Sequence, residues 1–182
     1  MKKFISLFSG CGGSSLGYEM SGMKSILAVD FDPKCCENYN LNFPNSSVWN
    51  LNIEDVSSND IMETFNIDMG ELDHIDFSPP CQGFSFAGKR NINDLRNLLL
   101  FQPVRFIKEL QPKSFIIENV EGLIKGKMKG IFNLLLDELS KLNYNIKWKS
   151  LNSVYYNLPQ SRQRIIIFGV RRDLGKDPIF PT

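Results

Sequence analysis

Residues 8–14 read Phe8-Ser9-Gly10-Cys11-Gly12-Gly13-Ser14, at the end of an apolar run of strand length. Three glycines within four positions let the backbone turn tightly and approach a ligand at the start of the next helix. Asp30 closes the second apolar run, twenty residues after Gly10, where its carboxylate can accept hydrogen bonds from both hydroxyls of a ribose. Phe31 beside it could stack on adenine or belong to the core. The pattern favours an adenosine cofactor, whereas the incomplete G-x-G-x-x-G spacing disfavours NAD.

Apolar runs of strand length alternate with helical patterns along most of the chain. The expected strands are 4–8, 25–29, 47–49, 74–77 and 115–117, and the expected helices are 14–20, 33–41, 61–65, 94–110 and 130–142. This alternation predicts an α/β fold around a mainly parallel sheet. Two further strands, at 145–151 and 165–170, have no helix between them, so they should pair antiparallel near the C-terminus.

The composition sets limits on the function. The chain of 182 residues has the size of one domain, with 42% apolar residues and a net charge of +1. This balance excludes a global cationic field, so any contact with a polyanion must be local. No apolar run approaches the roughly 20 residues of a membrane span, and the apolar start lacks a cleavage-like site, so we expect a cytoplasmic protein. Four cysteines without a C-x-x-C pair, and one histidine, predict reduced thiols and no metal site.

A diproline precedes a cysteine directly after the fourth apolar run, in Ser78-Pro79-Pro80-Cys81-Gln82. The prolines fix the backbone at the carboxyl end of that strand, where ligands of open α/β sheets bind, and they present Cys81 outside the sheet. A single cysteine is most often a small core residue. Here Glu118 ends the neighbouring strand and brings a carboxyl group to the same edge. Partial burial of a carboxyl group is unfavourable unless the group has a partner. The two residues predict a nucleophile and an acid.

Two arginines open the last apolar run, in Gln160-Ser161-Arg162-Gln163-Arg164. With the period-two alternation of a strand, Gln160, Arg162 and Arg164 share one face. The two guanidinium groups could hold the glutamate, the polar edge of a base or a phosphate. A run of charges is usually a solvated edge, but this one faces the expected position of Cys81 and Glu118.

These four segments, in this order and at these separations, resemble motifs I, IV, VI and VIII of the cytosine carbon-5 DNA methyltransferases, over essentially the whole chain. The resemblance implies a Rossmann-like methyltransferase fold that uses S-adenosylmethionine, releases S-adenosylhomocysteine and acts on duplex DNA. Cys81 would attack carbon 6 of a flipped-out cytosine, and Glu118 would hold or protonate ring nitrogen 3. Arg164 would bind the cytosine carbonyl, and Arg162 would buttress Glu118.

Two sets of binding residues follow. The cofactor set comprises Phe8, Ser9, Gly10, Cys11, Gly12, Gly13, Asp30, Phe31, Asn52, Ile53, Ser78 and Pro80. The DNA set lies in and after a polar loop that could close over phosphates, and comprises Gln82, Ser85, Lys89, Arg90 and Arg96. Asn52 stands where the family often has an acidic residue, although an amide oxygen can accept the same hydrogen bond. Asp76 is unusual inside a strand and has no assigned role, and His74 is expected at the surface.

Residues 1–182 are interpreted as one catalytic domain, with a cofactor-binding half at 1–72 and a catalytic half at 73–182. Family members continue into a target-recognition domain, which we expect here in cis or on a second subunit. The expected function is site-specific DNA methylation for restriction–modification. The alternatives are methylation of a cytosine in transfer RNA, because Ser-Pro-Pro-Cys-Gln also resembles that branch, and a catalytically silent regulatory module.

Overall fold

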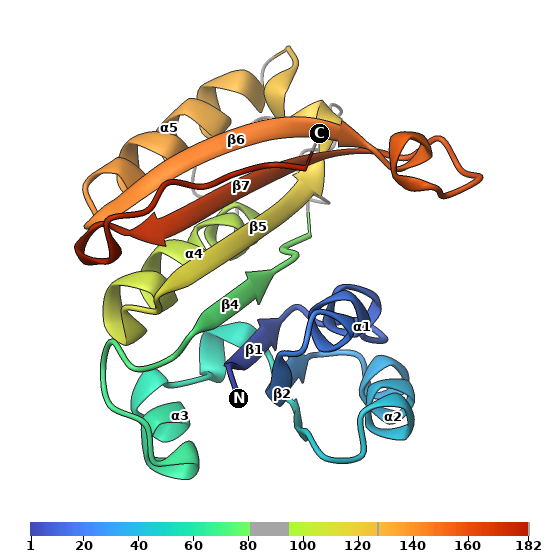
Figure 1. The fold of residues 1–182 in the computed structure, drawn as a ribbon, viewed down its shortest axis with the longest axis vertical. Coiled ribbons are helices and arrows are strands. Elements are labelled where there is room, and N and C mark those ends of the chain that lie inside the picture. The colour runs from blue at the N-terminus through green and yellow to red at the C-terminus, as the bar shows by residue number, and fades with distance from the viewer. Residues whose placement is uncertain (81–94, 127, 182) are drawn as a thin grey trace.

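A single mixed sheet runs through the molecule in the order β3-β2-β1-β4-β5-β7-β6 (Figure 1). The computed structural model describes residues 1–80, 95–126 and 128–181. Within these ranges the strands are β1 (Lys3–Leu7), β2 (Lys24–Asp30), β3 (Ser47–Asn50), β4 (His74–Phe77), β5 (Ser114–Val120), β6 (Tyr144–Asn152) and β7 (Gln163–Arg171). The first five strands pair in parallel, and β7 pairs antiparallel with both β5 and β6. The predicted α/β class, and the antiparallel pair near the C-terminus, are confirmed.

Helices cover both faces of this sheet. They are α1 (Gly13–Met20), α2 (Pro33–Asn42), α3 (Ser58–Phe65), α4 (Leu95–Leu110) and α5 (Met128–Ser140). Local signals start them: Pro33 is the first residue of α2, and the Asp32 carboxylate accepts a hydrogen bond from the Lys34 N–H at 2.8 Å. The Ser57 hydroxyl caps α3 in the same way, by accepting from the Asn59 N–H at 3.1 Å.

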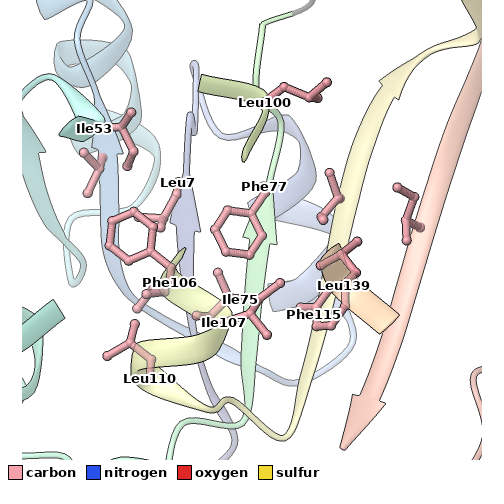
Figure 2. Close-up of a cluster of buried hydrophobic side chains, with 14 of the residues drawn as sticks. Leu7, Ile53, Ile75, Phe77, Leu100, Phe106, Ile107, Leu110, Phe115 and Leu139 are labelled. Carbon is pink, nitrogen blue, oxygen red and sulfur yellow. The ribbon is translucent and has the colours of Figure 1, made fainter. Parts of the chain in front are cut away.

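Part of the core lies between the sheet and α4. Figure 2 shows Ile75 and Phe77 of β4 beside Phe106 and Ile107 of α4, all of them buried. Residues of β1, β2 and β4 form nearly continuous buried runs, because both faces of these central strands are covered. In β5 buried and half-buried residues alternate, so one face of that strand is more open. This open face is the one that the functional site uses.

One predicted surface residue is buried. His74 begins β4 rather than ending a strand at the surface, and its side chain is covered by α1, with its ring centroid 4.7 Å from that of Tyr18. Its Nδ1 lies 2.9 Å from the Ser114 hydroxyl, whereas its Nε2 has no partner among the described residues. Burial lowers the pKa of His74 to about 4. The surface prediction was wrong because the helix that covers this strand is contributed by a distant segment.

Among the helices of residues 1–80, 95–126 and 128–181, none combines the length and the apolar character that a membrane span needs.

Candidate functional site

The glycine turn connects β1 to α1 and has a strained backbone. Phe8, Gly10 and Gly12 have positive φ values of 61°, 53° and 91°. Two features exclude a side chain at Gly12. Its positive φ is unfavourable for other residues, and a Cβ there would lie 2.3 Å from the Phe43 ring. The Gly10 N–H donates to Oδ2 of Asp30 at 2.8 Å, so the end of β2 holds the turn in position.

The loop after β2 is held from two sides. Oδ1 of Asp30 accepts from the Asp32 N–H at 3.0 Å, and the Asn50 amide donates to the carbonyls of Asp30 and Phe31 at 3.1 and 2.9 Å. The Phe31 side chain is 73% exposed, so the core alternative for this ring is wrong. An exposed aromatic ring beside a carboxylate provides a surface on which a base can stack.

The two predicted cofactor residues after β3, Asn52 and Ile53, differ in their exposure to solvent. Asn52 is exposed and immediately precedes a short 3-10 helix, whereas the Ile53 side chain is buried in the core. The Ile53 carbonyl accepts from the Arg105 guanidinium at 3.0 Å. Ile53 therefore anchors this loop to the core, and Asn52 is the residue of the pair whose side chain is accessible to a ligand.

A cleft of about 720 Å³ opens beside the glycine turn, within the range typical of small-molecule sites. It is bounded by the turn and α1 on one side and by β5, β7 and the C-terminal segment on the other. Predicted residues that line it are Phe8, Ser9, Gly10, Cys11, Gly13, Ser78, Glu118 and Arg162. Predicted residues outside this lining are Gly12, Asp30, Phe31, Asn52, Ile53, Pro80 and Arg164. The C-terminal residues Ile179, Phe180 and Pro181 also line the cleft, and no pattern in the sequence indicates this position.

An ion pair stands at the far side of this cleft. Nε of Arg164 lies 2.8 Å from Oε1 of Glu118, and both side chains are about one quarter exposed, at 24% and 30%. Arg162 is the predicted partner of Glu118, and Arg164 is the predicted contact of the cytosine carbonyl, whereas the structure pairs Glu118 with Arg164. The reason is that β7 begins at Gln163, so Arg162 precedes the strand and its side chain is exposed.

The segment that leads to Cys81 is anchored to both neighbouring strands. The Ser78 N–H donates to the Leu7 carbonyl at 3.2 Å, and the Asn119 amide donates to the Pro79 carbonyl at 3.0 Å. Asn119 is buried, and its Oδ1 accepts from the Val120 N–H at 2.9 Å. Asn119 was not assigned a role from the sequence, although it lies next to Glu118, and its position at the end of β5 is the signal that could have identified it.

Several predicted residues lie outside the described ranges, namely Cys81, Gln82, Ser85, Lys89 and Arg90. Arg96 lies in α4, but its side chain is not described. Within the described ranges no group of three or more metal-binding side chains occurs.

The order of the sheet, the glycine turn after β1 and the antiparallel C-terminal strands define the Rossmann-like class of S-adenosylmethionine-dependent methyltransferases. Within this class, the chain belongs to the C-5 cytosine-specific DNA methylase family, whose family model matches residues 2–182.

Curated relatives and solved structures agree with this assignment. The chain is 37% identical over 179 residues to the type II methyltransferase M.XorII of Xanthomonas oryzae, with 97% of this chain and 42% of the relative covered. It is 35% identical over 189 residues to the type II methyltransferase M.AquIA of Picosynechococcus, with 99% and 75% covered. The chain thus spans less than half of the first relative and three quarters of the second.

Two solved structures resemble the whole of this fold. One is described as a DNA modification methyltransferase encoded within an Escherichia coli prophage, and it matches with a TM-score of 0.85 at 33% identity, covering 98% of this chain and 49% of that one. The other is a Spodoptera frugiperda DNMT2 mutant, with a TM-score of 0.76 at 27% identity, covering 100% and 56%.

Proposed function

We propose that this chain transfers a methyl group from S-adenosylmethionine to carbon 5 of a cytosine in duplex DNA. The observation that carries the proposal is the paired Glu118 carboxylate facing the same cleft as the glycine turn. Methyl transfer requires that the methyl donor and the target base bind next to each other. The glycine turn on one side of this cleft would bind the donor, and Glu118 on the other side would bind the base.

The residues beside the cleft fit an adenosine-type donor. The Ser9 hydroxyl is buried in the lining and has no hydrogen-bond partner among the described residues, which suits a polar ligand atom. In bound S-adenosylmethionine, we assign Asp30 to the ribose and Phe31 and Asn52 to the adenine. The glycine turn and Ser78 would contact the rest of the cofactor. When bound, S-adenosylmethionine would supply an electrophilic methyl group.

Glu118 would act on the ring of the target base. Arg164 holds this carboxyl in one orientation, so that it can hydrogen-bond or protonate nitrogen 3 of a cytosine. Charge is thereby drawn away from carbon 6, where the Cys81 sulfur adds, and the electron pair released at carbon 5 takes the methyl group. Loss of the proton at carbon 5 to a base then lets the Cys81 thiolate leave, and return of the nitrogen 3 proton to Glu118 restores the ring and the enzyme.

The biological setting proposed is modification of DNA in a restriction–modification system, which the names of the type II relatives support. We further propose a cytoplasmic protein and a single catalytic domain with the two halves described above. Sequence choice on DNA would come from a target-recognition region in cis or on a second subunit, because direct readout needs side chains that reach base edges in a groove. The residues Gln82, Ser85, Lys89, Arg90 and Arg96 remain our candidates for contacts with the DNA backbone.

The test is transfer of a radiolabelled methyl group to duplex DNA and, in parallel, to transfer RNA, with the longest native form of the protein. We expect label in DNA, recovered as 5-methylcytosine after digestion. Glu118→Gln should lower the rate at least a hundredfold, because an amide cannot supply a proton, and Cys81→Ser should abolish transfer.

The matched control is Glu121→Gln. Glu121 lies three residues beyond Glu118 and also forms an ion pair, with Lys125 at 2.7 Å, but it does not line the cleft. This variant should retain the wild-type rate. Label confined to transfer RNA would contradict the substrate, and cofactor binding without any transfer would favour the silent module.

A further inference from the structure

Asp76 is a buried carboxylate at the floor of the cleft. It lies in the middle of β4 and is 2% exposed, yet it belongs to the cleft lining. Its Oδ2 accepts hydrogen bonds from the hydroxyls of Ser6 at 3.2 Å and Ser14 at 2.5 Å, and its Oδ1 accepts from the Tyr18 hydroxyl at 3.1 Å. These three hydroxyl donors stabilise the ionised form of the carboxylate against the cost of its burial.

The surroundings of this carboxylate supply no compensating cation. The pKa of Asp76 is raised above its usual value, mainly by burial and also by the nearby Glu118 carboxylate, although the three hydroxyls oppose this shift. Among the residues that the structure describes, no arginine or lysine pairs with Asp76, whereas Glu118 is paired with Arg164 at 2.8 Å. A buried, unpaired carboxylate beside a cleft is costly unless a bound ligand brings a positive charge.

The order of the sheet defines where such a charge would act. β4 lies between β1, which carries the glycine turn, and β5, which carries Glu118. Asp76 is the register partner of Ser6 on one side and of Ile116 on the other, two residues before Glu118. The carboxylate therefore lies on the strand between the glycine turn and Glu118, in the cleft that the proposed function assigns to the donor and the base.

We propose that Asp76 is a specificity-determining residue that favours a positively charged methyl donor over the uncharged thioether left after transfer. This inference rests on the proposed function, because it assigns the cleft to S-adenosylmethionine. The donor carries a sulfonium cation and the product does not, so the field of Asp76 distinguishes the two. The expected preference is about tenfold in affinity, which corresponds to about 1.4 kcal/mol.

A purely structural role would give a different result. The hydrogen bonds to Ser14 and Tyr18 also attach α1 to the sheet, so loss of Asp76 could loosen the whole site. Loosening would weaken all ligands of the cleft by similar factors. A change of charge would weaken only the cationic ones.

The experiment measures the dissociation constants of three ligands by calorimetry for the wild type and Asp76→Asn. The ligands are S-adenosylmethionine, S-adenosylhomocysteine and sinefungin, in which a protonated amine replaces the sulfonium. We expect Asp76→Asn to weaken both cationic ligands about tenfold and S-adenosylhomocysteine less than threefold. Equal weakening of all three, or no change in any, would overturn the proposal.

The matched control is Asp73→Asn, because Asp73 lies just before the same strand, is paired with Lys113 at 2.7 Å and does not line this cleft. It should leave all three constants unchanged. If Asp76→Asn does not fold, Tyr18→Phe removes one donor to the carboxylate and should reduce the preference for cations about threefold; an equal effect on the neutral ligand would count against the proposal. A wild type that binds none of the ligands would refute the proposed function instead.

Discussion

At the scale of single residues, Asp30 combines a structural contact with the ligand-binding role that we propose for it. Asp30 holds the glycine turn through the Gly10 N–H and the next loop through the Asp32 N–H, and each carboxylate oxygen keeps a further lone pair for a ligand. Its two tasks can be separated by substitution.

Asp30→Ala should weaken S-adenosylmethionine binding roughly ten- to hundredfold, the usual effect of losing hydrogen bonds to a charged group. Asp30→Asn keeps an oxygen that can accept from the Gly10 N–H, so its loss should be smaller and should report the missing charge. Calorimetry measures both constants. An unchanged constant for Asp30→Ala would mean that the ribose lies elsewhere.

His74 should make the stability of the protein depend on pH. Because burial lowers its pKa to about 4 from 6.5, the folded chain keeps the ring neutral where the unfolded chain protonates it. The unfolded state then binds the extra proton, so stability is lost as the pH falls from 6.5 toward 4, by about 2 kcal/mol between pH 7 and pH 5.

Urea unfolding at pH 7 and pH 5 measures this loss. His74→Leu removes the titrating group but leaves Asp76 and the other carboxylates, so the variant should lose about 2 kcal/mol less than the wild type over the same interval. Equal losses in the two proteins would show that His74 does not titrate abnormally.

At the scale of elements, the turn between β1 and α1 depends on the packing of α2 as well as on its own glycines. The Phe43 ring, immediately after α2, lies where a Cβ on Gly12 would be, and the Tyr39 ring lies 3.0 Å from the same position. The close packing of the Phe43 and Tyr39 rings against the turn therefore requires glycine at position 12.

Gly12→Ala should destabilise the fold by about 2–4 kcal/mol, because it combines a left-handed backbone with an overpacked contact. Gly13→Ala is the control, since a Cβ there meets nothing within 4 Å and the residue starts α1. Its stability in urea should differ from the wild type by less than about 1 kcal/mol. If both variants unfolded at the same urea concentration, the predicted clash between an alanine at position 12 and the Phe43 ring would be wrong.

At the scale of the whole molecule, the site exists because the sheet reverses direction after β5. β7 returns antiparallel beside β5, so that Arg164 lies opposite Val120 and its side chain reaches Glu118. The C-terminal segment then follows this face, and the Phe180 ring lies 6.3 Å from that of Phe168. Figure 1 shows this segment running along β7. The cleft is consequently closed on one side by residues far in sequence from the glycine turn.

The sequence alone determined the class of fold and the ends of the strands where the site lies. Alternating apolar runs, a glycine turn and an acidic residue after the second run are local patterns, and local backbone geometry follows from them. The expected strand at 47–49 and helix at 61–65 are present as β3 and α3, although α3 begins earlier, at Ser58. Glu118 was identified because a carboxyl at the end of an apolar strand needs a partner.

Only the tertiary structure decided which partner that is, and how His74 and Asp76 are surrounded. The pairing of Glu118 depends on where β7 begins and on its register with β5, and the burial of His74 and Asp76 depends on α1 lying across β4. Register and helix packing are set by contacts between segments distant in the chain, whereas a period of two or 3.6 residues reports only on neighbours. For that reason the sequence indicates which strand ends carry the candidate site, and the packing of distant elements determines which charged groups pair there.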